Sequence, residues 1–169
     1  RLFHFRMKKL WAPWRIEYIR SEKDDGCIFC DKPKMNYKEG LILVKGKTIC
    51  TLMNLYPYTN GHLMVAPYRH IDSFHELDNS EKIELLEYID KSVRVLEKVM
   101  NPDGFNIGAN IGEVAGAGIK DHIHFHVVPR WSGDTNFMPV LGHTKVQVQG
   151  LQDCYDSLKP HFDRINLDD

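Results

Sequence analysis

The sequence lacks any long hydrophobic run, any excess of one charge and any visible secretory leader. No stretch approaches the roughly 18 consecutive apolar residues of a membrane-spanning helix, so we expect no membrane partner. The 22 basic and 23 acidic residues leave a formal charge of -1, which argues against an extended basic face for duplex nucleic acid. Any bound anion must therefore be met by local groups. Without a secretory signal, we expect a cytoplasmic location.

Cysteine is also scarce, and the four cysteines are Cys27, Cys30, Cys50 and Cys154. In the absence of a secretory signal we interpret them as thiols or metal ligands rather than disulfides. The Cys27-x-x-Cys30 spacing is typical of half a zinc site, which needs two further ligands. Two buried thiols are the alternative, and a redox motif is disfavoured because no βαβ unit surrounds the pair. For Cys50 and Cys154, which lie among apolar strand and helix residues, we expect packing.

The chain of 169 residues is expected to form a single domain, 1–169. We divide it into an N-terminal arm at 1–26, a core at 27–130 and a C-terminal extension at 131–169. Neither an internal repeat nor a linker to a second domain is recognisable.

Hydrophobic patterning predicts an α+β fold. Two apolar runs flank Lys45-Gly46-Lys47, which is a hairpin signal. A three-and-four apolar spacing predicts an amphipathic helix over 79–100, capped by Asn79 or Ser80. A second helix is predicted at 152–165, interrupted at Pro160. This order favours an antiparallel sheet covered on one side. The expected strands lie at 41–44, 48–53, 62–66, 105–110 and 121–130.

Histidines alternate with apolar residues in the last of these strands. Alternation places His122, His124 and His126 on one face of the sheet and the apolar residues on the other. Positions two apart are about 6.6 Å apart and positions four apart about 13 Å apart, so a shared zinc ion would require a sharp bend. We therefore favour a division of labour, with the middle imidazole as a nucleophile toward phosphorus. A catalytic zinc held by the histidines is the alternative.

The His122-x-His124-x-His126 motif, followed by two apolar residues, resembles the signature of the histidine-triad (HIT) superfamily of nucleotidyl hydrolases and transferases. Asn54 and His62 match the asparagine and Gly-His positions of that family. The resemblance covers roughly residues 27–130, judged from the motifs. Two further matches are more narrowly similar to the microbial diadenosine tetraphosphate phosphorylase-like branch, namely Trp11-Ala12-Pro13-Trp14-Arg15 and the segment 133–140.

The resemblance implies a fold and an activity. The fold is a five-stranded antiparallel sheet with two helices, and a homodimer joins two sheets into one of ten strands. The activity is cleavage of dinucleoside polyphosphates at the α-phosphate, by hydrolysis or phosphorolysis, through a nucleotidyl group on His124. His126 would hydrogen-bond phosphate oxygens, and His62 would support the triad. Asn54 would contact ribose, and Asn110 would contact ribose or phosphate. No organic cofactor is expected.

The small-residue loop at 112–118 lies next to the triad, where backbone N–H groups can approach a phosphate closely. Many family hydrolases carry Gln, Ser or Thr shortly before the first triad histidine, but this chain has Gly118 and Ile119. The difference argues against hydrolysis of small phosphoramidates and leaves room for phosphorolysis. Two other functions stay open, a nucleotide-binding regulatory module without turnover and a hydrolase of other nucleotide conjugates.

The Cys27-x-x-Cys30 pair also fits the resemblance. Some bacterial HIT proteins and galactose-1-phosphate uridylyltransferases hold a structural zinc with such a pair and two histidines. The similarity implies His70 and His122 as the remaining ligands, which would tie the N-terminal segment to the histidine strand. Metal and triad would then share His122.

Overall fold

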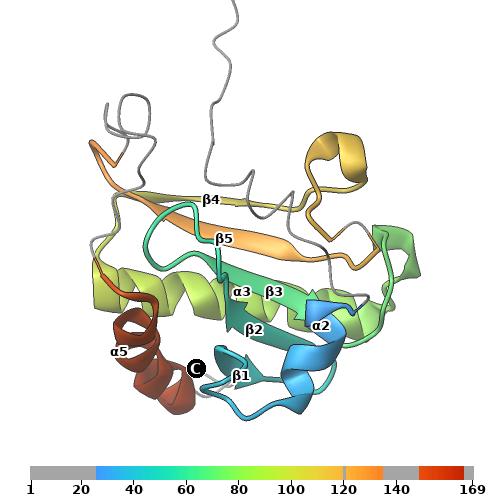
Figure 1. The fold of residues 1–169 in the computed structure, drawn as a ribbon, viewed down its shortest axis with the longest axis horizontal. Coiled ribbons are helices and arrows are strands. Elements are labelled where there is room, and N and C mark those ends of the chain that lie inside the picture. Colours follow the sequence, from blue (N-terminus) through green and yellow to red (C-terminus); the bar gives the residue numbers. More distant parts are fainter. Residues whose placement is uncertain (1–25, 120, 135–148, 166–169) are drawn as a thin grey trace, which may run out of the picture.

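The computed structural model of the chain describes residues 26–119, 121–134 and 149–165. These residues contain a five-stranded sheet in the order β1-β2-β3-β5-β4, with every neighbouring pair antiparallel (Figure 1). The predicted α+β class and antiparallel sheet are confirmed. The five strands are β1 (Ile42–Lys45), β2 (Ile49–Met53), β3 (Leu63–Pro67), β4 (Gly104–Gly108) and β5 (Phe125–Arg130).

Two long helices pack against one face of the sheet and enclose the main hydrophobic core (Figure 1). They are α3 (Asn79–Met100) and α5 (Leu151–Arg164). The one-turn helix α2 (Ile28–Asp31) lies against the opposite face, where Phe29 is fully buried among side chains of β1, β2 and β3. Three short 3-10 turns complete the described elements. They are η1 (Lys32–Lys34), η2 (Phe74–Glu76) and η3 (Glu113–Ala115).

Helix α3 has the predicted bounds but a different cap. The side chain of Asp78 accepts a hydrogen bond from the backbone N–H of Glu81 at 2.9 Å, and the Glu81 carboxylate accepts from the N–H of Asp78 at 2.9 Å. The prediction of Asn79 or Ser80 was wrong by one or two positions. The reciprocal pairing of a capping box favours Asp78, because Glu81 stands three residues beyond it.

A buried carboxylate joins α3 to the hairpin between β1 and β2. Glu84 accepts hydrogen bonds from the backbone N–H groups of Lys47 and Thr48, each at 2.7 Å, and from the Thr48 hydroxyl. Its side chain is buried, so these donors replace the water that the charge has lost. The hairpin is thereby held over the helix side of the sheet.

Helix α5 runs through Pro160 without a break, contrary to the predicted interruption. Proline removes one backbone hydrogen bond inside a helix. Burial of Tyr155, Leu158 and Phe162 against the core holds the helix on both sides of this position. Tertiary packing therefore outweighs the local cost of proline.

Among the helices of the described residues, none is long and apolar enough to cross a membrane. The cytoplasmic location stays a prediction. The motif at 11–15 and most of the motif at 133–140 lie outside the described residues, as does nearly all of the arm at 1–26.

Candidate functional site

Only one of the three motif histidines lies in a strand. β5 begins at Phe125, so His126 belongs to it, whereas His122 and His124 precede it. The predicted strand over 121–130 is therefore too long at its N-terminal end. The backbone N–H of Ile123 donates to the carbonyl of Ile71 at 2.6 Å instead of joining the sheet ladder, and this bond draws the chain away from β3.

The His124 ring is held by the backbone two residues earlier in the chain. Its Nδ1 lies 2.8 Å from the carbonyl oxygen of His122. A carbonyl can only accept, so Nδ1 carries the proton and Nε2 is left with its lone pair. Burial lowers the pKa of His124, although the bond to the His122 carbonyl opposes the shift. The imidazole is therefore neutral near pH 7, with a nucleophilic nitrogen.

A directed chain of hydrogen bonds sets the opposite proton pattern on His126. The backbone N–H of Tyr58 donates to Nδ1 of His62 at 3.0 Å, so a neutral His62 carries its proton on Nε2. That Nε2 lies 2.9 Å from Nδ1 of His126 and donates to it. A neutral His126 consequently carries its proton on Nε2. The rings of His124 and His126, whose centroids are 5.0 Å apart, thus supply one acceptor and one donor.

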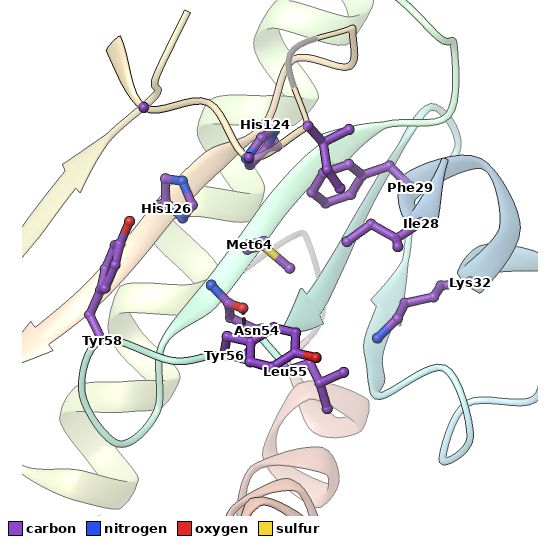
Figure 2. Close-up of a pocket in the computed structure, with 13 residues that line it drawn as sticks. Ile28, Phe29, Lys32, Asn54, Leu55, Tyr56, Tyr58, Met64, His124 and His126 are labelled. Carbon is purple, nitrogen blue, oxygen red and sulfur yellow. Dashed lines mark hydrogen bonds between the residues drawn. The ribbon is translucent and has the colours of Figure 1, made fainter. Parts of the chain in front are cut away.

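His124 and His126 line a pocket between α2, the segment after β2 and the loop before β5 (Figure 2). Asn54 and Gly118, both predicted to contact substrate, also line it. Asn110 is not in the lining; its side-chain amide lies 3.4 Å from the carbonyl of Gly116, at the base of the 112–118 loop. The remaining lining residues are mostly apolar or aromatic. They are Ile28, Phe29, Lys32, Leu55, Tyr56, Tyr58, Met64, Gly116 and Ile119.

Two aromatic residues that the sequence interpretation did not select position the histidines. Phe29 packs on His124 with ring centroids 4.5 Å apart, and Tyr58 stacks on His62 at 4.7 Å. Phe29 stands between the two cysteines of the Cys-x-x-Cys motif, which concealed its second role. Tyr58 lies four residues before His62 in a turn, and only the folded turn brings its N–H to the ring.

Asn54 is oriented within the same turn. Its side-chain oxygen accepts from the backbone N–H of Tyr56 at 2.9 Å, which directs its NH2 group toward His62 at 3.3 Å. The turn thus brings Asn54 and His62 together, while the predicted ribose contact of Asn54 stays a prediction.

Four further side chains, one of them the first motif histidine, form a cluster that could hold a metal ion: Cys27, Cys30, His70 and His122. Their ligand atoms all lie within 4.8 Å of one another. Nδ1 of His122 is 3.3 Å from Sγ of Cys27, 3.6 Å from Sγ of Cys30 and 3.3 Å from Nδ1 of His70. All four predicted ligands therefore meet.

These separations fit a tetrahedral zinc ion. With Zn–S near 2.3 Å and Zn–N near 2.05 Å, tetrahedral geometry requires about 3.6 Å between sulfur and nitrogen and about 3.3 Å between the nitrogens. His122 is also in the required tautomer, because its Nε2 donates to the carbonyl of Pro67 at 2.8 Å and leaves Nδ1 unprotonated toward the cysteines. Burial lowers the pKa of His122, which favours the neutral, ligating form.

The other two cysteines are core residues, as predicted. Cys154 is buried in the main hydrophobic core on the helix side of the sheet, and Cys50 is buried on the opposite side with Phe29. Burial raises the pKa of Cys50 to about 12 and that of Cys154 to about 11, so both remain thiols.

The five-stranded antiparallel sheet and the paired imidazoles define the class of histidine-triad α+β proteins, and the comparisons place the chain in it. The model of the HIT domain family matches residues 37–133. The AP-4-A phosphorylase of Mycobacterium tuberculosis is 39% identical over 156 residues, which cover 87% of this chain and 80% of the phosphorylase. The chain therefore belongs to the HIT domain family.

Solved structures agree on the fold. A hypothetical histidine triad nucleotide-binding protein of Sulfolobus tokodaii superposes with a TM-score of 0.65 at 22% identity, covering 81% of this chain and 92% of the other. A Zn-bound histidine triad family protein of Mycobacterium smegmatis gives 0.63 at 21% identity, covering 82% and 94%.

Proposed function

We propose that the protein cleaves dinucleoside polyphosphates at the α-phosphate through a nucleotidyl group carried on His124. The observation that carries this proposal is the opposed protonation of two neighbouring imidazoles, an unprotonated Nε2 on His124 and a protonated Nε2 on His126. Nucleophilic attack on phosphorus needs the first, and a phosphate oxygen is stabilised by the second. The 39% identity with an AP-4-A phosphorylase supports the choice of substrate.

In the first step the Nε2 lone pair of His124 attacks the α-phosphorus and forms an N–P bond. The bond from phosphorus to the bridging oxygen breaks, and the nucleoside polyphosphate leaves with that electron pair. His126 donates its Nε2 proton in a hydrogen bond to the phosphate oxygens. The positive charge that develops on His124 is stabilised by its Nδ1–H bond to the His122 carbonyl.

In the second step an acceptor oxygen attacks the same phosphorus and the N–P bond breaks, with its electron pair returning to Nε2 of His124. The proton that a water acceptor loses passes to solvent, and His124 is again neutral. Water as acceptor releases a nucleoside monophosphate, and inorganic phosphate releases a nucleoside diphosphate. Gly118 and Ile119 line the pocket without offering a side-chain hydroxyl or amide. We favour phosphate as the acceptor, because these positions lack the polar side chain that many hydrolases of the family carry there.

We further propose that Cys27, Cys30, His70 and His122 hold a structural zinc. The cluster lies behind the pocket, and Phe29 separates it from the substrate side by packing on both His122 and His124. When bound, the metal would cross-link α2 to the segment that carries His124 and would take no part in the reaction. The fit of the ligand distances supports this assignment.

The predicted homodimer has an available edge. Within the described residues, β4 lies at the end of the sheet with no strand on its outer side, and Ile107 on it is half exposed. An unpaired strand edge with an exposed apolar side chain is suited to pairing with a second copy. Light scattering on the purified chain tests this, and a monomer at micromolar concentration would contradict it.

The test of the activity is to incubate the protein with diadenosine tetraphosphate, with and without inorganic phosphate, and to identify the products. Phosphorolysis yields ADP and ATP only when phosphate is present, whereas hydrolysis yields AMP and ATP without it. His124→Ala should abolish turnover and keep measurable nucleotide binding. Unchanged turnover in that variant would overturn the mechanism. Binding without turnover, across dinucleoside polyphosphates of several lengths, would favour a regulatory module instead.

A further inference from the structure

Among the described residues that line the pocket, Lys32 is the one lysine or arginine. No carboxylate stands among these described lining residues. In the described part of the chain, the arginines that follow β3 and end β5 are engaged elsewhere. Arg69 forms a bidentate pair with Glu81 at 2.6 and 2.7 Å, and Arg130 forms one with Asp134 at 2.6 and 2.8 Å. The catalysis described above assigns no role to the cation of Lys32.

Lys32 lies at the end of the pocket away from the histidines (Figure 2). It belongs to η1, directly after α2, and its side chain reaches toward Leu55 and Tyr56. Asn54 lies between this end and the histidine end (Figure 2). A nucleotide with its α-phosphorus at His124 and its ribose at Asn54 would place its base against the apolar wall at the Lys32 end.

The environment of Lys32 suits a ligand with acceptor atoms. Its side chain is half-buried and lines the pocket. Within the described part of the chain no carboxylate forms an ion pair with it, whereas neighbouring lysines are paired: Lys34 contacts Asp31 at 3.3 Å, and Lys45 donates to the carbonyl of Pro33 at 2.6 Å. An ammonium group in an apolar wall costs free energy unless an acceptor meets it.

We propose that Lys32 reads the edge of the nucleobase and favours guanine over adenine. A lysine ammonium offers three donors and no acceptor. Guanine presents two adjacent acceptors, O6 and N7, whereas adenine places an amino donor beside its N7. The inference rests on the proposed function, because that function sets which end of the pocket receives the base. Phosphate recognition is disfavoured, because the phosphates lie at the histidine end.

The experiment compares diguanosine and diadenosine tetraphosphates as substrates of the full chain and of Lys32→Met, which keeps an unbranched side chain one atom shorter and removes the donors. The ratio of kcat/KM for guanine over adenine should fall by about tenfold in the variant. Lys32→Arg should retain most of the ratio. Lys34→Met is the matched control, because Lys34 lies two residues away, exposed and outside the pocket lining, and it should leave the ratio unchanged. Circular dichroism and thermal melting confirm that each variant is folded.

An equal loss on both substrates would overturn the proposal, because it would mean that Lys32 acts on phosphate or on structure. An unchanged ratio in Lys32→Met would also overturn it. If the wild-type chain turns over neither substrate, the proposed function fails, and calorimetric binding of GMP and AMP then tests Lys32 by itself. A preference for GMP that Lys32→Met abolishes supports the proposal, and no preference in the wild type refutes it.

Discussion

Replacing His62 with alanine tests whether the hydrogen-bond chain sets the chemistry of the site. In the wild-type chain His62 accepts a hydrogen bond from the backbone N–H of Tyr58 and donates one to His126. His62 is fully buried, so water cannot readily replace it. The variant leaves Nδ1 of His126 without its donor, and the proton of His126 can then move to Nδ1, which turns an acceptor nitrogen toward the phosphate.

The expected loss of turnover in His62→Ala follows from the hydrogen bonds that the substitution removes. Leaving a buried polar group without its partner costs about 1–3 kcal/mol, which corresponds to roughly a 5- to 150-fold loss if it appears in the transition state. Because the donor acts on charge that develops during the reaction, kcat should fall more than KM rises. His62→Gln, whose amide can both accept and donate, should recover part of the loss.

The assay is steady-state turnover of diadenosine tetraphosphate, with melting temperature recorded for each variant. His75→Ala serves as the control histidine, because His75 is exposed in η2 and lies outside the pocket lining. A folded His62→Ala variant that keeps the wild-type kcat would refute the hydrogen-bond chain as the source of the His126 donor.

Three further outcomes follow from particular contacts. Metal analysis of the purified chain should find one zinc per molecule. Cys30→Ser should lose this zinc, whereas Cys154→Ser, a control in the core, should keep it. Retention of zinc by Cys30→Ser would contradict the tetrahedral site. Glu84→Gln should lower the free energy of unfolding by about 1–3 kcal/mol in urea titrations, since an amide NH2 would face the N–H donors of the hairpin. Pro160→Ala should raise it by about 1–3 kcal/mol, because Pro160 is exposed in a helix interior; a lower value would show that the proline is needed.

Much of the fold followed from periodicity. The three-and-four spacing of α3 is long and regular, and the strand patterns differ from the observed bounds by one or two residues in most cases. The break at Pro160 and the length of the last strand were predicted wrongly for a common reason. Both depend on tertiary contacts, the packing of α5 on the core and the bond from Ile123 to Ile71, which local sequence does not encode.

The site was only partly accessible from sequence. The histidine spacing and the family motifs identified the imidazoles and the four cluster residues, which the structure brings together. Protonation could not be predicted, because it depends on which backbone groups face each ring nitrogen. The place of Lys32 in the pocket could not be predicted either. This residue follows the Cys-x-x-Cys motif in a polar stretch, and it enters the pocket only when α2 packs on the sheet.

The most direct test of the central claim is detection of the nucleotidyl group on His124. A rapidly quenched single turnover of diadenosine tetraphosphate, examined by intact mass spectrometry under basic conditions that preserve N–P bonds, should show the chain with one added adenylyl group. Peptide mapping should locate this group on His124, and His124→Ala should show none. Turnover without any adduct at the shortest quench times, together with activity in His124→Ala, would contradict the proposed mechanism.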